Sequence, residues 1–498
     1  MNGYTKKHPS RRRRNWACVL LLALIMAIGA FTLVMEMTSL IGPPGAIGLT
    51  WRNRFTKWLS AEEAVSNEDL LHQSLLFEVC VEDTNASIPW QFGSPGNQLV
   101  GGTANNSHVL MHKSDKDLLQ KLRQCPDIDV FLPHGTRSYG YCEDAVAYVK
   151  YLESRLLPEW VLEIKVLDPD LGRKVDYFDL CPKTPMLFLD HHWGGLTESP
   201  RWPQDKPVYM MPNIEKMEIT PMHFLRVDAV LCKSHECYER VTKWFEQYGN
   251  RRDAKVFYTK HTSSSPELFV RKRLGEYAVA PKDFSNVRFV HTAGSSHSKG
   301  TREVVECWLS NPKLPPLDAY IDREPFNRLF SASTRLKIAR SLSPVNIHLG
   351  MLKPLNYSKV VAEASFVVNP SYSEGYGHII NQARATGAVI VTTDLPPMNE
   401  LITAKETGML VSVQRRNHPM VMLGGKYRGR YGLKDCDGLV ASFESSEVCK
   451  VIKQVLQLTT PTERAEMGFN ARWQYHADTK YFAKAMQQLR DYARKIKL

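Results

Sequence analysis

Short apolar runs alternate with stretches of helical periodicity along most of the chain. The strand-like runs of the first half are at 129–133, 160–168, 185–190, 207–212, 227–234 and 255–259, with helical stretches at 142–156 and 236–249. Within 236–249, Cys237, Val241, Trp244, Phe245 and Tyr248 recur at the spacing of one buried helix face. Because the strand-like runs are almost continuously apolar, we expect parallel strands covered by helices on both faces.

The alternation restarts after a polar stretch at 261–285, which we interpret as a linker. The second series has strand-like runs and helices at 287–294, 301–310, 316–322, 345–352, 359–364, 365–370, 379–387, 388–394 and 408–413. Two such series predict an α/β protein with two Rossmann-like, doubly wound domains, which we place at 108–275 and 286–470. Ligands of such sheets bind beyond the carboxyl ends of the strands, so we expect a site in the cleft between the domains. A last helical stretch, 471–498, is predicted to pack across both.

A long apolar run comes before both domains. Six basic residues in the tail 1–15 precede twenty residues, 16–35, that match the length needed to cross a hydrocarbon core. The positive-inside rule keeps such a tail in the cytoplasm. We therefore expect a transmembrane signal anchor at 16–35, a stem and loop-rich insertion at 36–107, and a luminal body in the Golgi or endoplasmic reticulum. A cleaved signal peptide is the alternative, because Ala27 and Ala30 offer small residues.

Composition and charge narrow the class of protein. With 498 residues, 43% of them hydrophobic, the chain is long enough for two sizeable cores. The formal charge of +12 owes six units to the tail, and no zinc-finger spacing or long basic helix follows. We therefore expect no nucleic-acid partner.

Nine cysteines lie outside the apolar run, and their scattered spacing gives no metal-ligand signature. An oxidising lumen would let some of them pair, and the odd number leaves at least one unpaired. Acceptor patterns for N-glycosylation at Asn85, Asn105 and Asn356 are compatible with a luminal body.

A turn-rich segment, SYSEGYGH at 371–378, separates a strand-like run from a helix. Gly375 and Gly377 allow the backbone to approach a ligand closely, and the free amides of the following helix attract an anion such as phosphate. Glu374 repels phosphate but can accept hydrogen bonds from sugar hydroxyls. The segment thus suits a ligand with a phosphorylated and a hydroxylated part, such as a nucleotide sugar. A turn in which Glu374 caps the helix is the alternative.

A second glycine-bearing segment, HTAGSSHSKGT at 291–301, follows the first strand of the second series. Sheet topology places it on the same edge as the Glu374 segment. It is not a phosphate-binding P-loop, in which glycine precedes lysine, because here Lys299 comes before Gly300. Lys299 can neutralise a diphosphate leaving group at this edge. An ordinary solvated lysine is the alternative.

With these two segments, residues 287–412 resemble retaining glycosyltransferases of the GT-B fold, of the group 1 or family 4 type. That family has a glycine-rich strand end followed by Lys-Gly, then E-G-x-G and a helix with a second glutamate. The resemblance implies that Glu374 contacts the donor sugar, that Gly375 and Gly377 contact the phosphates or the sugar, and that Lys299 contacts the diphosphate.

The resemblance also places Gly294, Tyr376 and His378 at the donor, and it shows two departures. Gln382 stands where the family has its second glutamate, which is thought to hold the nucleotide ribose, and its amide can still accept a hydrogen bond. Ser295 stands where the family usually has arginine. His297 or Arg302 could supply the missing positive charge.

In the first half, Asp190, His191 and His192 end a strand-like run. A histidine that faces the donor from this domain is common in the resembling enzymes, so we take His191 and His192 as catalytic candidates. Successive strand residues point to opposite faces, so we expect at most one of them to face the cleft. His134, with Arg137 and Tyr139, is a candidate for the acceptor side, with a satisfied turn histidine as the alternative.

The sequence thus predicts a membrane-anchored glycosyltransferase that moves a sugar from a nucleotide-sugar donor to a hydroxyl of a glycan, lipid or protein acceptor. We expect retention of configuration, no bound cofactor and no metal. Three Asp-x-Asp patterns, at 127–129, 168–170 and 435–437, keep a metal-dependent glycosyltransferase open as an alternative. A catalytically degenerate binding module and an epimerase-like enzyme also remain open.

Overall fold

The computed structural model describes residues 65–94 and 106–497, which form one compact unit from Val65 onward. The predicted tail and membrane span, with most of the predicted stem, lie outside the described residues. Among the described helices, none is both long enough and apolar enough to cross a membrane.

The N-terminal domain is built on a seven-stranded sheet of order β1-β3-β2-β6-β7-β8-β9. Its strands are β1 (Ile88–Pro89), β2 (Asp129–Phe131), β3 (Arg155–Leu157), β6 (Met186–Leu189), β7 (Val208–Met211), β8 (Ala229–Cys232) and β9 (Lys255–Tyr258). Neighbouring strands are parallel, except that β1 is antiparallel to β3. The strand order reverses between β2 and β6, and such a reversal opens a crevice at the carboxyl edge of the sheet.

The C-terminal domain has a six-stranded, fully parallel sheet of order β12-β11-β10-β13-β14-β15. Its strands are β10 (Phe289–Gly294), β11 (Leu317–Ile321), β12 (Val345–Leu349), β13 (Phe366–Val368), β14 (Val389–Thr393) and β15 (Gly408–Val411). The order reverses between β10 and β13, the two strands that precede the Lys299 and Glu374 segments. The prediction of two Rossmann-like α/β domains is confirmed.

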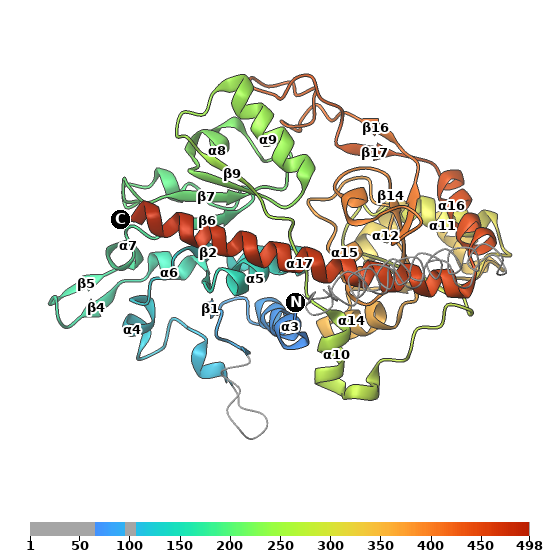
Figure 1. Ribbon diagram of the computed structural model, residues 1–498, viewed down its shortest axis with the longest axis horizontal. Helices are drawn as coiled ribbons and strands as arrows, with labels where there is room; N and C mark the ends of the chain where they lie inside the picture. Colours follow the sequence, from blue (N-terminus) through green and yellow to red (C-terminus); the bar gives the residue numbers. More distant parts are fainter. Residues whose placement is uncertain (1–64, 95–105, 498) are drawn as a thin grey trace, which may run out of the picture. The chain divides into compact units, whose positions relative to one another are not determined.

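Helices cover both faces of each sheet (Figure 1). In α9 (His235–Tyr248), the predicted face is buried apart from Tyr248, which is partly exposed at the end of the helix. Ser234 caps the first turn by accepting from the amide of Cys237, and Gly249 ends the helix with φ +86°. Further helices are α4 (Leu118–Leu122), α5 (Tyr139–Tyr151), α7 (Tyr177–Leu180), α8 (Pro221–Arg226), α11 (Thr301–Ser310), α12 (Arg323–Leu329), α13 (Ala332–Arg340), α14 (Pro354–Glu363), α15 (His378–Ala385) and α16 (Ser445–Leu458). A short antiparallel pair, β16 (Gln414–Arg416) and β17 (Val440–Ser442), lies outside the main sheets.

Two segments differ from the patterns expected from sequence. Helix α3 (Asn67–Glu82) lies within the range 36–107 but belongs to the N-terminal domain, where it packs against α5. It buries polar His72 and Gln73 beside its apolar residues, so it has no clean apolar stripe. The run 160–168 forms α6 (Glu159–Glu163) and then β4 (Val166–Asp168), which pairs with β5 (Arg173–Val175) outside the main sheet.

The polar stretch 261–285 is not a plain linker. Residues 261–265 are buried between the two domains, and α10 (Pro266–Leu274) packs against α14 and α3. The expectation was wrong because the small hydroxyl side chains that suggested a loop make buried hydrogen bonds. The Ser264 hydroxyl donates to Glu143, and the Ser264 amide donates to the other oxygen of the same carboxylate at 2.8 Å.

The last helix, α17 (Pro461–Lys497), begins before residue 471 and joins both domains (Figure 1). Its first part packs against α15, β14 and β15, and its second part reaches α5. Phe482, Met486 and Leu489 belong to the hydrophobic core on one face of the N-terminal sheet. The helix therefore completes a core that begins four hundred residues earlier in the chain, at Leu76.

Four disulfides pair eight of the nine cysteines outside the apolar run. They are Cys80–Cys142, Cys125–Cys181, Cys232–Cys237 and Cys307–Cys449. Cys436 is free.

Candidate active site

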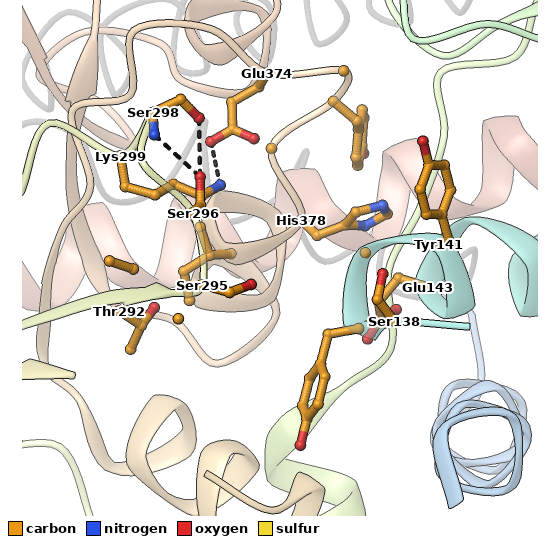
Figure 2. A pocket seen from close by; sticks show the side chains of 18 of the residues that line it. Ser138, Tyr141, Glu143, Thr292, Ser295, Ser296, Ser298, Lys299, Glu374 and His378 are labelled. Atoms are coloured by element: carbon orange, nitrogen blue, oxygen red, sulfur yellow. Dashed lines mark hydrogen bonds and ion pairs between the residues drawn. The ribbon is translucent and has the colours of Figure 1, made fainter. Parts of the chain in front are cut away.

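A cavity of about 560 Å³ lies where the carboxyl ends of β10 and β13 face the N-terminal domain. Figure 2 shows its two sides, with the Lys299 and Glu374 segments on one and the start of α5 on the other. The predicted donor residues that line it are Gly294, Lys299, Glu374, Gly375, Tyr376, Gly377, His378 and Gln382. Residues far apart in sequence thus meet at the switch point of the C-terminal sheet, where ligands of such folds bind.

Lys299 and Glu374 form an ion pair at the edge of this cavity (Figure 2). The Lys299 ammonium donates to the Glu374 carboxylate, which also accepts from the hydroxyl of Ser371. Both side chains are largely buried, with 16% and 12% of their surfaces exposed. A cation and an acid therefore lie side by side at the carboxyl ends of β10 and β13.

Glycines allow the close approaches that bring these segments together. Gly300 adopts φ +62°, and a Cβ there would lie 2.2 Å from the carbonyl oxygen of Pro370, so the two segments touch at the backbone. A Cβ on Gly375 would lie 1.9 Å from Oδ1 of Asn213 in the N-terminal domain. The Glu374 segment is thus in direct contact with the opposite domain.

Helices α11 and α15 both begin at the cavity after a left-handed glycine, Gly300 or Gly377, with no side-chain cap. Their first backbone N–H groups have no partner within the helix, as at every helix start. These two helix ends are a favourable environment for an anion.

His378 links the two domains beneath the cavity. Its Nδ1 lies 2.9 Å from the hydroxyl of Ser263 and its Nε2 lies 3.0 Å from Asp144. The Lys233 ammonium donates to both oxygens of Asp144, at 2.8 and 2.9 Å. Burial alone would raise the pKa of Asp144, but Lys233 and His378 outweigh it and hold that pKa well below the usual range.

Gln382 lines the cavity, yet the protein engages both ends of its amide. Its Nε2 donates to Glu143 at 2.6 Å, and its Oε1 accepts from the Tyr357 hydroxyl at 2.7 Å. Only 3% of its surface is exposed. Gln382 therefore ties α15 to α5 and α14.

The two histidine candidates are not among the residues that line the cavity. Strand β6 ends at Leu189, and Asp190 then takes a left-handed conformation with φ +59°, so the alternation of strand side chains no longer applies to His191 and His192. Their rings lie side by side, with centroids 4.2 Å apart. The hydroxyl of Tyr141, which does line the cavity, donates to Asp190 at 2.8 Å.

Other candidates occupy different places. His134 is exposed and contacts Glu159 at 2.8 Å, while Tyr139 lines the cavity and donates to the carbonyl oxygen of Leu352 at 2.6 Å. Ser295 lines the cavity, but His297 pairs with Glu324 at 3.1 Å and does not.

Two of the three Asp-x-Asp patterns are engaged by arginines. Asp168 and Asp170 both accept from Arg123, at 2.6 and 3.2 Å. In the pattern 127–129, Asp129 is buried against Arg155 at 2.8 Å. None of these patterns contributes a lining residue to the cavity.

The N-terminal domain contributes a charged wall to the cavity that was not predicted from the sequence. Asn213, Glu215 and Lys216 follow β7, and Lys233 follows β8. Burial and the nearby charge of Asp190 raise the pKa of Glu215 to about 7. Their only signal in the sequence is their position after apolar runs, at the carboxyl edge of the sheet.

Residues 331–418 match the family model described as "Glycosyl transferases group 1". Over this segment the chain is therefore similar to glycosyltransferases of group 1. The match includes β13, the Glu374 segment and α15, and it confirms the predicted enzyme class, glycosyltransferase. With two parallel α/β domains around one cavity, the architecture of this glycosyltransferase is GT-B-like.

Solved structures similar to this glycosyltransferase are distant. The Anabaena protein HepE in complex with UDP and glucose is 15% identical, with a TM-score of 0.41 over 62% of this chain and 78% of that one. Sucrose-phosphate synthase from Thermosynechococcus elongatus is 14% identical, with a TM-score of 0.48 over 74% and 98%. Likenesses at this level carry no argument about fold or function. No curated protein sequence matches the chain.

Proposed function

We propose that this protein transfers a sugar from a nucleotide-sugar donor to a hydroxyl group of a glycan, lipid or protein acceptor. The observation that carries the proposal is the pairing of Lys299 with Glu374 at the switch point of the C-terminal sheet, inside the group 1 architecture.

In the proposed scheme the ion pair is exchanged for ligand contacts. The Lys299 ammonium turns from Glu374 to the diphosphate, whose negative charge grows as the bond to the sugar breaks. The uncapped starts of α11 and α15 supply backbone N–H groups to the same phosphates. Glu374, released from the lysine, accepts hydrogen bonds from sugar hydroxyls and fixes the orientation of the sugar. The cavity walls exclude water that would hydrolyse the donor.

The finer features of the proposal rest on the resemblance to retaining enzymes of the family 4 type. We propose retention of the anomeric configuration, with donor and acceptor on the same face of the sugar. No step of this scheme passes through a metal ion or a bound cofactor. Gln382 is engaged by Glu143 and Tyr357, so we assign it to the joint between the domains and not to the ribose.

For location, we propose a single-pass membrane protein whose residues 16–35 anchor a luminal body in the Golgi or endoplasmic reticulum. The length and apolar character of 16–35 and the basic tail before it support the anchor. Four disulfides favour an oxidising compartment. The acceptor asparagines Asn85 and Asn356 are exposed, as modification requires.

The experiment uses the chain secreted from an oxidising host and measures nucleotide release from a panel of nucleotide sugars. Lys299→Ala and Glu374→Gln should each lower turnover by roughly 10²- to 10³-fold, the usual effect of losing one group that stabilises developing charge. The matched control is Lys359→Ala, which breaks a Lys–Glu ion pair with Glu363 in the same domain, away from the cavity.

Three results would count against the proposal in different ways. Unchanged turnover in both cavity variants would remove the site assignment. Donor binding without turnover in the wild type, measured by calorimetry, would favour a binding module. Product formation without any acceptor would favour an epimerase-like enzyme.

A further inference from the structure

A second cluster of chemically active side chains lies in the N-terminal domain, behind the cavity wall. One donor atom each from Asp190, His191 and His192 lies within 4.8 Å of the others. The cluster stands at the carboxyl end of β6, at the switch point of the N-terminal sheet. It is separate from the Lys299–Glu374 pair, which belongs to the other domain.

The unusual backbone at Asp190 is what makes this cluster possible. In an extended strand, three consecutive side chains would alternate between the two faces of the sheet. The left-handed turn at Asp190 breaks that alternation and lets all three side chains converge. A non-glycine residue in this conformation is strained, and such strain persists mainly where it serves a site.

The cluster contains buried polar atoms that lack a partner. Nδ1 of His191 and Nε2 of His192 are shielded from solvent and make no hydrogen bond, and the same is true of Oε2 of Glu215. The distance from His191 Nδ1 to the Asp190 carboxylate is 3.8 Å, which is too long for a hydrogen bond. Buried nitrogen atoms without partners are costly, and an ion is one of the few groups that can satisfy both histidines at once.

We propose that Asp190, His191 and His192 bind a divalent transition-metal ion such as Zn²⁺, with water completing the coordination. Two imidazole nitrogens and one carboxylate form a donor set that zinc takes in proteins, where a fourth position stays open to water. One donor atom from each of the three side chains already lies within 4.8 Å of the others.

Further contacts orient the ligands as metal sites require. Tyr141 donates its hydroxyl to Asp190 at 2.8 Å, and the backbone amide of Asn213 donates to the other carboxylate oxygen at 3.4 Å. Such second contacts fix the direction of a ligand. Because Tyr141, Asn213 and Glu215 also line the cavity, the ion would stiffen the wall that faces the Glu374 segment.

The chain offers an internal comparison in a second group, Asp144, His261 and His378, whose donor atoms are equally close. There the Lys233 ammonium already donates to both Asp144 oxygens. A lysine cation thus occupies the place that a metal ion would take. Among the described residues, Asp190, His191 and His192 form no ion pair with a lysine or an arginine; their one ion pair is internal, between His191 and Asp190.

The test starts from whole secreted protein stripped with EDTA. Zn²⁺ is titrated calorimetrically against a competing chelator, and Co²⁺ is added separately to record its visible absorption. We expect one Zn²⁺ per chain, a rise in melting temperature on binding, and a Co²⁺ spectrum of nitrogen and oxygen ligands. The proposal is independent of sugar transfer, because none of these measurements uses a donor.

The variants then locate the ion. His191→Ala and His192→Ala should each weaken Zn²⁺ binding by more than about 100-fold, and Tyr141→Phe by roughly 10- to 100-fold, the usual effect of losing a group that orients a ligand. Asp190→Asn, which keeps size and shape, serves if a histidine variant fails to fold. His134→Ala, which removes an exposed histidine, is the matched control and should leave binding unchanged.

Two outcomes would overturn the proposal. One is a wild-type protein that neither binds Zn²⁺ under these conditions nor gives a Co²⁺ spectrum. The other is Zn²⁺ binding that survives in the folded His191→Ala/His192→Ala double variant, because the ion would then be held elsewhere.

Discussion

Replacing Gln382 by glutamate should loosen the joint between the two domains. In the wild type, the Gln382 amide donates to the buried Glu143 carboxylate at 2.6 Å. The substitution keeps the size of the side chain but turns the donor into a second acceptor. Two carboxyl groups would then face one another where only 3% and 2% of these residues' surfaces are exposed.

The expected loss has two parts. A hydrogen bond to a charged group contributes about 1.5–3 kcal/mol, and a buried carboxylate left without its donor adds a penalty of similar size. Proton uptake by one of the two carboxyl groups relieves part of this loss of folding free energy. We therefore expect a destabilisation of about 3 kcal/mol, which for a unit of this size corresponds to a fall in melting temperature of roughly 3–4 °C.

The loss should grow with pH. Burial raises the pKa of Glu143 above its usual value, and a second carboxyl group beside it raises the shared pKa further. The folded variant then holds a proton that the unfolded chain releases, so its stability falls as the pH rises above the ordinary glutamate range. The difference from wild type should be smallest near pH 5 and largest at the alkaline end.

Thermal unfolding followed by intrinsic fluorescence across this pH range measures the effect. The decisive comparison is the double variant Glu143→Gln/Gln382→Glu, which restores one amide and one carboxylate with their positions exchanged. It should recover at least half of the lost stability. If the double variant is no more stable than Gln382→Glu alone, with a coupling below about 0.5 kcal/mol, the two residues do not act as a pair and the reasoning fails.

Three further predictions follow from single contacts. Gly375→Ala should lower turnover because the added Cβ would collide with the Asn213 side chain. Adding Asn213→Ala should restore part of the lost turnover. If Gly375→Ala has no effect on turnover, the segment moves freely and this contact does not fix it. Cys80→Ser/Cys142→Ser should cost about 2–5 kcal/mol in a thermal unfolding assay, and an unchanged melting temperature would contradict a structural role. Burial lowers the pKa of Lys282 to about 7, so between pH 7 and 9 the unfolded chain binds a proton that the folded chain has lost. The free energy of unfolding of the wild type should therefore rise relative to that of Lys282→Met as the pH rises from 7 to 9. Parallel stability–pH curves for the two proteins would refute this prediction.

Much of the fold could be predicted because its strands are buried on both faces. Runs such as 185–190 and 388–394 are apolar almost without interruption, and they became β6 and β14. Helix α3 could not be predicted in the same way. It packs against α5 on one side and α10 on another, so polar His72 and Gln73 are buried with its apolar residues and no stripe marks the helix in the sequence.

At the site, the glycines that follow two strands and the expected sheet topology were enough to place the Lys299 and Glu374 segments at the same edge of the sheet. Contacts between the domains could not be located in this way. Nothing near Gln382 in sequence indicates that Glu143, from the other domain, takes its amide. Likewise, the left-handed turn at Asp190 overrides the strand alternation that sequence reasoning assumes for His191 and His192.

The position of α17 has a consequence for the order in which the protein is made. The ribosome completes the N-terminal sheet long before Phe482, Met486, Leu489 and Ala493 are synthesised, yet these residues cover one face of its core. Until α17 has been synthesised, that face stays open to water or to other proteins. The emergence of α17 is therefore the event that lets the first domain reach its final form.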